Sequence, residues 1–275
     1  MHTARIIGPG RAGRSLSFAL GEAGWHVAPL LGRGDDQRQA ARGVDVLVIA
    51  TPDDVIGATA AAVRPSPSTV VVHLSGSLGL EVLEPHPRRG ALHPLVPLPT
   101  AEIGARRLAG GATFAVAGDP LAADIVRALG GRAVPLDDAD RAAYHAAASI
   151  AANHVVALLG QVERVAASAG LPLEAFLGLT RAALDDVARL GPAGALTGPA
   201  ARGDWATLAR HRDALAAAER PAYHAGVALA RRLVEPAVSA APPEVSEDAD
   251  EPAEEAPEVR VPGSRLAGAG SIGVR

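Results

Sequence analysis

The stretch that decides the fold is Ile6-Ile7-Gly8-Pro9-Gly10-Arg11-Ala12-Gly13, which spaces three glycines as G-x-G-x-x-G between an apolar run and a helical run. Gly8 allows a tight turn, Gly10 lets the backbone approach a pyrophosphate, and Gly13 permits close packing of the helix on the strand. The N–H groups that begin the helix, at Arg11 and Ala12, are suited to receive the phosphate charge. The stretch therefore predicts a dinucleotide cradle; the alternative is a glycine-rich turn without a ligand.

Around this cradle, residues 1–136 alternate short β-branched runs with alanine-rich helical runs, the rhythm of βαβ units and a parallel sheet. We expect an α/β Rossmann domain that binds NAD(P) over these residues. The expected strands are 4–8, 26–31, 45–50, 69–74, 91–96, 113–117 and 132–136, and the expected helices are 11–23, 55–63 and 120–129.

The second region, residues 137–235, has no strand signal and predicts an all-α domain, whose long first helix is of a kind that often forms a subunit interface. Its first helix is expected over 139–169, about 45 Å long at 1.5 Å per residue, with further helices at 172–190, 204–218 and 221–235. Residues 236–275 are rich in Pro, Ala and Glu and carry eight acids against three Arg. Such a segment cannot bury enough apolar surface to order itself, so we expect a disordered acidic tail.

The composition limits the chemistry. The 275 residues include no Cys and no Lys, and all 26 basic side chains are Arg. A disulfide, a thiolate metal site, a thiol nucleophile and a Schiff-base lysine are therefore excluded. The nine His show no H-x-x-x-H spacing, so no metal site is expected.

Charge and hydropathy bear on the partners. The net charge of −4 arises in the tail, since residues 1–235 carry 23 Arg against 22 acids. A near-neutral body that is poor in aromatic residues predicts no nucleic-acid partner. No run reaches the roughly 18 apolar residues of a membrane span, and a strand-like run begins at Arg5, where a signal peptide would lie. We therefore expect a soluble, cytoplasmic protein with no membrane partner.

The residue that selects between NAD and NADP is expected at the end of the second strand, about 20 residues after the cradle. Arg33 stands there, and no acid that would accept a ribose 2′-hydroxyl does; Asp35 and Asp36 come slightly late. Because a guanidinium suits a 2′-phosphate, NADP is favoured, with NAD as the alternative if Arg33 is simply an exposed arginine.

Polar residues also follow the third and fourth strands. Thr51, Pro52 and Ser75 stand at carboxyl ends of parallel strands, where open α/β sheets bind ligands, and are expected near the nicotinamide. Thr51 and Ser75 are equally suited to cap the helices that follow. For Asp53, capping is the favoured interpretation.

Four stretches resemble one superfamily of oxidoreductases, which includes 6-phosphogluconate dehydrogenase, prephenate dehydrogenase, pyrroline-5-carboxylate reductase and ketopantoate reductase. Over residues 3–235 they look like a branch that pairs a Rossmann-like domain with a C-terminal domain of unknown function, some members of which are thought to be alternative ketopantoate reductases. The resemblance implies hydride transfer in the cleft between the domains and a homodimer through the long helices. The stretches are Val72-His73-Leu74-Ser75-Gly76, Gly90-Ala91-Leu92-His93-Pro94-Leu95, Tyr144-His145-Ala146-Ala147-Ala148 with Ala152-Asn153, and Ala195-Leu196-Thr197-Gly198-Pro199 with Arg202-Gly203-Asp204.

In relatives of the ketopantoate-reductase type, the proton donor is commonly a lysine four residues before an asparagine on the first long helix. If Asn153 is that asparagine, Ser149 takes the place of the lysine, so the mechanism of the family does not carry over unchanged. His145 is the natural substitute, because positions 145, 149 and 153 climb one face of the helix and an imidazole exchanges protons near neutral pH. The alternatives are a buried, structural His145 and a second donor, Tyr144.

Two more motifs offer substrate contacts. His93, in Leu92-His93-Pro94, resembles the histidine of the His-Pro motif in prephenate dehydrogenases, where it contacts the substrate; the alternative is a strand-terminating dipeptide. Arg202 is the expected clamp for a substrate carboxylate, with Thr197 beside it, unless Arg202 is one more surface arginine. Asp204 is expected to cap the helix that follows it.

The sequence thus predicts an NADPH-dependent reductase of a small 2-oxo acid such as ketopantoate, with His145, Asn153 and His93 as catalytic residues. Ser149, Thr197 and Arg202 are its expected substrate-binding residues. The alternatives are a prephenate-type dehydrogenase or imine reductase, and a dinucleotide-sensing or scaffold protein that has lost the chemistry.

Overall fold

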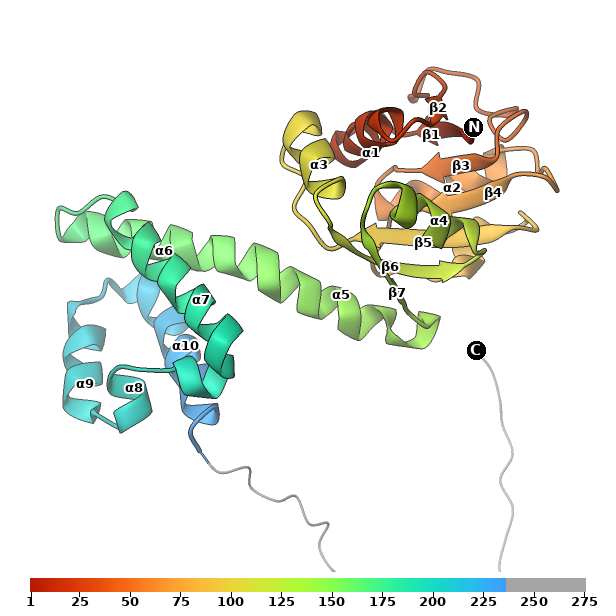
Figure 1. Cartoon of the computed structure of the whole chain (residues 1–275). Helices are drawn as coiled ribbons and strands as arrows, with labels where there is room; N and C mark the ends of the chain where they lie inside the picture. Colours follow the sequence, from red (N-terminus) through yellow and green to blue (C-terminus); the bar gives the residue numbers. More distant parts are fainter. Residues whose placement is uncertain (236–275) are drawn as a thin grey trace, which may run out of the picture.

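A computed structural model describes residues 1–235, which form a sheet domain followed by an all-helical region (Figure 1). The predicted fold class, a Rossmann-like α/β domain followed by helices, is confirmed. The acidic tail predicted at 236–275 lies outside the described residues.

Seven strands form one sheet in the order β2-β1-β3-β4-β5-β6-β7. The second strand is shorter than predicted, because the two-residue spacing of its donors to β1, His26 and Ala28, is broken by one extra residue before Leu31. The chain rejoins β1 only at a single bridge between Leu31 and Ile7. The strands are β1 (Thr3–Ile7), β2 (His26–Val27), β3 (Val46–Ile49), β4 (Val70–His73), β5 (Arg89–Pro94), β6 (Thr113–Gly118) and β7 (Arg132–Pro135).

The central strands β3 and β4 are apolar except for His73 at the end of β4, because helices cover both faces of the sheet. Every residue of β3 and β4 is buried. Successive side chains enter opposite cores, as the two-residue period of a strand requires: Val48 belongs to the core beneath α1 (Arg11–Glu22), and Ile49 to the core beneath α2 (Asp53–Ala62).

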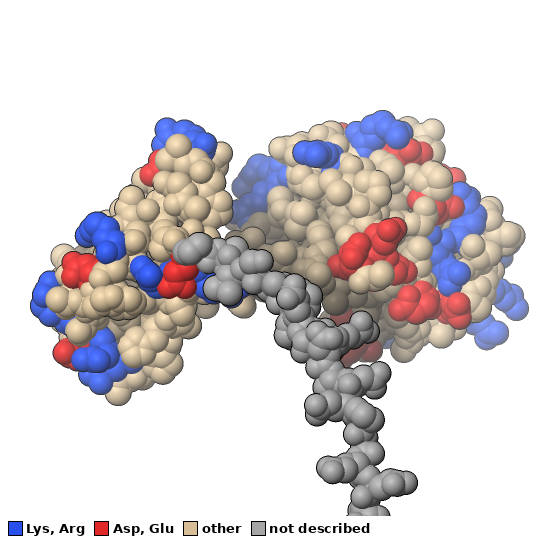
Figure 2. All heavy atoms as spheres, turned by 90° about the horizontal axis from the view of Figure 1, so that it is seen from below, with Lys and Arg blue, Asp and Glu red and all other residues tan. Residues whose placement is uncertain are grey.

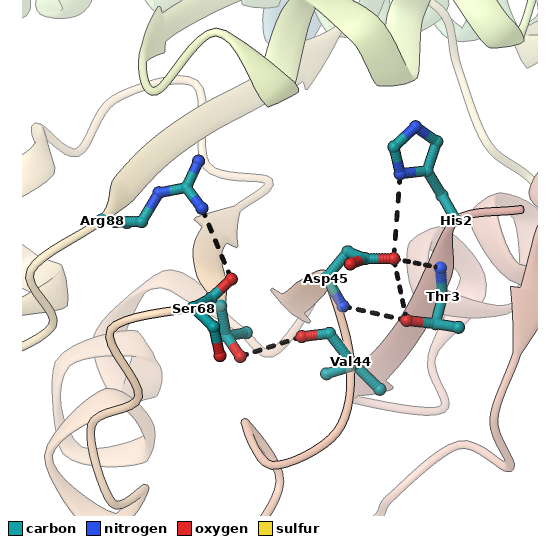
Figure 3. A network of polar contacts seen from close by, with 7 residues as sticks. His2, Thr3, Val44, Asp45, Ser68 and Arg88 are labelled. Atoms are coloured by element: carbon teal, nitrogen blue, oxygen red, sulfur yellow. Dashed lines mark hydrogen bonds and ion pairs between the residues drawn. The ribbon is translucent and has the colours of Figure 1, made fainter.

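A network of polar contacts joins the start of β1 to the residue before β3 (Figure 3). The Asp45 carboxylate accepts hydrogen bonds from the Thr3 backbone N–H at 2.8 Å and from the Thr3 hydroxyl at 3.0 Å. The Thr3 hydroxyl in turn accepts one from the Asp45 N–H. The backbone hydrogen bond from Thr3 is the main reason that the pKa of Asp45 is lowered. This network fixes the pairing of two strands that end at the glycine cradle.

One helix of the sheet domain escaped prediction. Helix α3 (Ala101–Leu108) packs against α1 and begins at Thr100, whose hydroxyl accepts from the Ile103 N–H. Gly104 is needed at this crossing, because a Cβ there would collide with the Ser15 hydroxyl. The helix that follows β6, α4 (Leu121–Ala128), lies close to its predicted position.

The expectation of an all-parallel sheet is wrong at one place, since β6 runs antiparallel to β5. Helix α3 packs on α1 and does not run back along β5. Strand β6 therefore begins beside the C-terminal end of β5. The Leu95 N–H accordingly donates to the Thr113 carbonyl at 2.8 Å. Strand β7 is parallel to β6 and is therefore reversed as well.

The helical region begins with one long helix, Asp138–Ser168, that leaves the sheet and carries the remaining helices at its far end (Figure 1). A π-helical segment, Ile150–His154, interrupts it. The second predicted helix, 172–190, ends where expected, because Gly191 (φ +71°) is not helical; the bounds of α7 include the short helical segment that Pro192 begins after this break. The helices are α5 (Arg141–Ser149), α6 (Val155–Ser168), α7 (Glu174–Ala195), α8 (Pro199–Arg202), α9 (Trp205–Ala214) and α10 (Arg220–Arg232).

The helical region buries little apolar surface within the described chain. Ala166 and Leu208 are its only buried apolar residues between 137 and 235, whereas Val156, Leu179 and Leu229 are 62 to 71% exposed. The helix Asp138–Ser168 is also long and apolar enough to cross a membrane by length and composition, a feature that the sequence interpretation missed because short polar residues interrupt its apolar runs.

Candidate functional site

The glycine cradle has the geometry that its sequence predicts. Gly8 has φ +110°, and a Cβ there would stand 2.5 Å from the Ala50 carbonyl oxygen. A Cβ on Gly13 would collide with the Gly8 carbonyl, so both positions require glycine. A Cβ on Gly10, by contrast, would meet no atom within 4 Å outside its own stretch of chain, which leaves open space over the start of α1.

A cavity of about 450 Å³ opens over this cradle. Helix α1 begins without a capping side chain, so its first N–H groups are free to meet an anion. The Thr51 hydroxyl is fully buried and has no hydrogen-bond partner among residues 1–235. An open glycine, an uncapped helix start and an unpartnered hydroxyl fit a dinucleotide. The lining residues are Gly10, Arg11, Ala12, Ala50, Thr51, Pro52, Leu74, His93, Pro94, Val96 and Leu98.

Arg33 lies in the turn that runs beside the cradle. The Gly8 N–H donates to the Leu31 carbonyl at 2.9 Å, and Gly32 lies against the Pro9 ring. Arg33 is exposed and has no side-chain hydrogen bond within the described chain. Asp35, by contrast, already accepts from the Gly32 N–H at 2.7 Å.

A second cavity, of about 510 Å³, meets the first at His93. It brings together His93, His145, Ser149 and Asn153, which are four of the predicted site residues. The π segment lies on this face of the long helix, and π segments are frequent at functional sites. The lining residues are His93, Pro94, Leu95, Val96, Pro97, His145, Ala148, Ser149, Ala151, Ala152, Asn153 and Val156.

Two imidazoles lie over Gly76, in the loop after β4. A Cβ on Gly76 would stand 2.8 Å from Cδ2 of His145 and 2.9 Å from Nε2 of His93. The two rings meet edge to face, with centroids 5.8 Å apart. The Tyr144 hydroxyl lies 2.6 Å from Nδ1 of His93. The absence of a side chain at Gly76 therefore lets the helix approach the end of β5.

Burial controls ionisation at this junction. It lowers the pKa of His93 to about 4, helped by the neighbouring His145 and Arg141 and opposed by Asp53, so His93 is neutral at neutral pH. Burial also raises the pKa of Tyr144 to about 12, so the phenol keeps its proton.

The prediction that Asp53 caps α2 is wrong, since no side chain caps this helix. Its carboxylate accepts hydrogen bonds from the Ser75 hydroxyl at 2.6 Å and from the Ser77 hydroxyl at 3.0 Å. The Ser75 oxygen also accepts from the N–H groups of Ser77 and Leu78. Ser75, a predicted cofactor contact, is thus used to fix the loop after β4 and does not line the cradle cavity.

A cluster of charged and titratable groups around the buried Arg141 was missed by sequence reasoning. The Arg141 side chain is 1% exposed, and its Nε donates to the Asp138 carboxylate at 2.6 Å. Its two terminal nitrogens have no partner in residues 1–235. Asp138 also accepts from the Leu80 N–H, and these hydrogen bonds outweigh burial, so its pKa is lowered.

His73, at the end of β4, completes this cluster. It is fully buried, and neither ring nitrogen has a well-formed hydrogen bond within the described chain. Burial, with a further contribution from Arg141, lowers its pKa to about 4. The Gly79 backbone, Asp53 and Asp138 offset this only in part.

The last predicted contacts lie elsewhere. Thr197 and Arg202 are exposed and line neither cavity. Asp204 caps α9 as predicted, since its carboxylate accepts from the Thr207 N–H at 3.0 Å.

Charged side chains are interspersed over both halves of the face in Figure 2. The described residues that line the 510 Å³ cavity, by contrast, include no Arg, Asp or Glu. Within residues 1–235, no group of three or more His, Asp and Glu is placed to hold a metal ion.

Comparisons with known proteins agree with this architecture. Residues 113–235 match the profile of a domain of unknown function, DUF2520. The C-terminal domain of unknown function expected from the sequence is thereby confirmed over this range. No curated protein sequence matches the chain significantly.

Solved structures share the fold. A candidate NADP oxidoreductase from Bacteroides fragilis is 19% identical with a TM-score of 0.68, and covers 84% of this chain and 98% of its own. A Thermotoga maritima protein is 23% identical with a TM-score of 0.64 and the same coverage of both chains. An imine reductase from a Pseudomonas species is 15% identical with a TM-score of 0.59, covering 84% of this chain and 94% of its own.

The neutral, buried His73 predicts that stability falls on mild acidification. The unfolded chain binds a proton near pH 6.5, whereas the folded chain binds one only near pH 4. Between pH 7 and pH 5 this difference removes about 2 kcal/mol of unfolding free energy. Urea unfolding of the wild type and of His73→Leu at both pH values measures it, and we expect a smaller loss in the variant.

His224→Gln provides the control, because His224 is exposed. We expect it to keep the wild-type loss between pH 7 and pH 5. An equal loss in His73→Leu and in the wild type would show that His73 does not cause the effect.

Proposed function

We propose that the protein is an NADPH-dependent reductase that acts on a small carbonyl substrate in the 510 Å³ cavity. The observation that carries the proposal is the position of His93, which lines both this cavity and the cradle cavity. A cofactor in one cavity and a substrate in the other would meet at this side chain. The likeness in fold to a candidate NADP oxidoreductase supports the choice of cofactor.

The chain's own residues are suited to hold the dinucleotide. Gly10 and the uncapped start of α1 would bind the pyrophosphate, and the unpartnered Thr51 hydroxyl would meet the nicotinamide half. Arg33 would pair with the 2′-phosphate. When bound, the reduced nicotinamide supplies a hydride to the substrate carbon.

The two histidines take different roles. His93 is neutral at neutral pH, so it serves as a hydrogen-bond donor to the substrate oxygen rather than as a cationic acid. His145, on the same cavity, delivers the proton that the oxygen needs once the carbon has been reduced. Asn153 orients the substrate through its amide, and Ser149 adds a hydroxyl between them.

For the substrate we propose a small 2-oxo acid, of which ketopantoate is an example. Its carboxylate needs a cation, and Arg202 lies outside the cavity in its own chain. The assignment therefore requires a second copy of the chain to bring Arg202 to the site. An imine is the second candidate, favoured because the described lining of the cavity holds no Arg.

The exposed apolar side chains of the helical region support a homodimer. This region buries only two apolar residues of its own, so a permanent partner must cover Leu179, Leu229 and Val156. A second copy is always present at the same concentration and offers the same face, as a two-fold interface requires. Val156 also lines the substrate cavity, so such an interface would adjoin the site.

Turnover of a substrate panel tests the proposed reaction. With NADPH and a series of small 2-oxo acids and cyclic imines, we expect loss of nicotinamide absorbance with one class. His145→Gln is expected to lower kcat about 100-fold or more, the range for loss of a general acid. Its NADPH affinity, measured by fluorescence titration, should stay unchanged.

His224→Gln is the matched control and is expected to keep full activity, since His224 is exposed and lines neither cavity. Wild-type rates in His145→Gln would remove His145 from the mechanism. NADPH binding without turnover across the panel would favour a dinucleotide sensor instead.

Arg33→Ala tests the cofactor preference. Loss of a charge-assisted hydrogen bond to the 2′-phosphate is expected to weaken NADPH binding about 10- to 100-fold, equal to about 1.4 to 2.7 kcal/mol, and to leave NADH binding unchanged. Calorimetry with both cofactors measures this. Arg38→Ala, in the same turn, should change neither affinity, and tighter binding of NADH by the wild type would contradict the assignment.

Light scattering after size exclusion tests the homodimer, with a mass of two 27.7 kDa chains expected. Leu179→Glu is expected to yield monomers, because it places a charge on a 71% exposed leucine of the proposed interface. Phe18→Glu, at a 48% exposed position of the sheet domain, should keep the dimer. A monomeric wild type, or its recovery in the membrane fraction, would overturn the proposal.

A further inference from the structure

The hydrogen bond between Tyr144 and His93 joins the long helix to the end of β5. The phenol oxygen lies 2.6 Å from Nδ1, and the two rings meet edge to face. This contact bridges two parts of the site that are 51 residues apart in the chain. A neutral imidazole carries one proton, so the partner at Nδ1 decides which nitrogen holds it.

We take the phenol as the donor in this pair. Its hydrogen has no other acceptor among residues 1–235, so donation to Nδ1 gives it a partner inside the protein, whereas donation by Nδ1–H would leave the phenol hydrogen to solvent. Burial raises the pKa of Tyr144 to about 12, which Arg141 offsets only in part, so the phenol keeps the proton that it donates.

The other nitrogen of His93 is free. Nε2 makes no hydrogen bond to residues 1–235 and is not among the fully buried atoms that lack a partner. It lies over Gly76, where the lack of a Cβ keeps it uncovered, and its ring lines both cavities.

We infer that Tyr144 is a positioning residue for His93: its hydroxyl donates to Nδ1 and thereby keeps the ring proton on Nε2, where it is presented to the substrate. The catalytic role of His93 in this inference rests on the proposed reductase function, whereas the assignment of its ring proton to Nε2 does not. The Nε2–H then donates to the carbonyl oxygen as negative charge develops on it, and it stays on the ring while His145 delivers the proton.

The groups that face His93 keep this arrangement through neutral pH. They are His145 and Arg141 on the long helix, His73 on β4, and Asp53 on α2. Three of them oppose a second proton on His93 and only Asp53 favours one, so the neutral ring persists until the pH approaches about 4.

The chain contains a matched control for this pair. It has only two tyrosines, and each lies next to a histidine in sequence and bonds through its hydroxyl to Nδ1 of a different histidine. Tyr223 bonds to His211 at 2.8 Å, entirely within the helical region and outside both cavities. Tyr144→Phe and Tyr223→Phe therefore remove the same hydrogen bond in two places.

Nitrogen-15 NMR of the full chain, labelled at histidine, tests the inference without substrate or cofactor. We expect the His93 signals, assigned by their loss in His93→Gln, to show the Nε2–H tautomer alone at pH 7. In Tyr144→Phe we expect a mixture of both tautomers, whereas Tyr223→Phe should change only His211. A wild-type Nδ1–H tautomer, or an unchanged His93 in Tyr144→Phe, would overturn the inference.

Kinetics supply the second arm. With the substrate found in the panel, Tyr144→Phe is expected to lower kcat about tenfold, equal to about 1.4 kcal/mol, with KM for NADPH unchanged. Tyr223→Phe should match the wild type. The tautomer result stands if the panel yields no substrate, so failure of the reductase proposal is distinguishable from failure of this one.

Discussion

The ion pair between the buried Arg141 side chain and the partly exposed Asp138 carboxylate is the interaction on which the site depends. Asp138 binds both the Arg141 side chain and the Leu80 backbone, so it ties the first turn of the long helix to the loop after β4. Removing the Asp138 carboxylate would leave the buried Arg141 guanidinium without its only hydrogen-bond partner among residues 1–235, which makes the pair costly to break from that side. Tyr144 and His145 follow within one turn and reach His93 because this start is fixed.

The site beside this pair is built from neutral groups. His93 and His73 both lose their charge through burial, and Tyr144 retains its proton for the same reason. Burial lowers the local dielectric constant around these groups, which strengthens each remaining electrostatic interaction between them. In a chain without lysine, the proposed reaction would take its proton from imidazole, and a cation for an acidic substrate would have to come from Arg.

The sequence pattern predicted those elements whose structure depends on interactions between residues close together in the chain. The glycine cradle depends on adjacent residues, and the central strands β3 and β4 show their burial as unbroken apolar runs. The reversal of β6 could not be predicted, because it follows from the packing of Gly104 on α1, far away in sequence. Asp53 looked like a helix cap, since its true partner, Ser75, is 22 residues away. Arg141 was indistinguishable from 25 other arginines until its burial was visible.

The reversed strands set the direction from which the long helix approaches. Because β7 is antiparallel to β5, it ends toward the side of the sheet where β5 begins, which is opposite the side that carries the cofactor cradle. The helix then travels along the sheet, passing His73 before it reaches His93 and the loop beyond. If β7 were parallel to β5, the long helix would begin on the cradle side of the sheet and lead away from it. The side chains of His145, Ser149 and Asn153 would then lie beyond the substrate cavity. The reversed direction of β7 thus determines that the long helix runs past both histidines of the site.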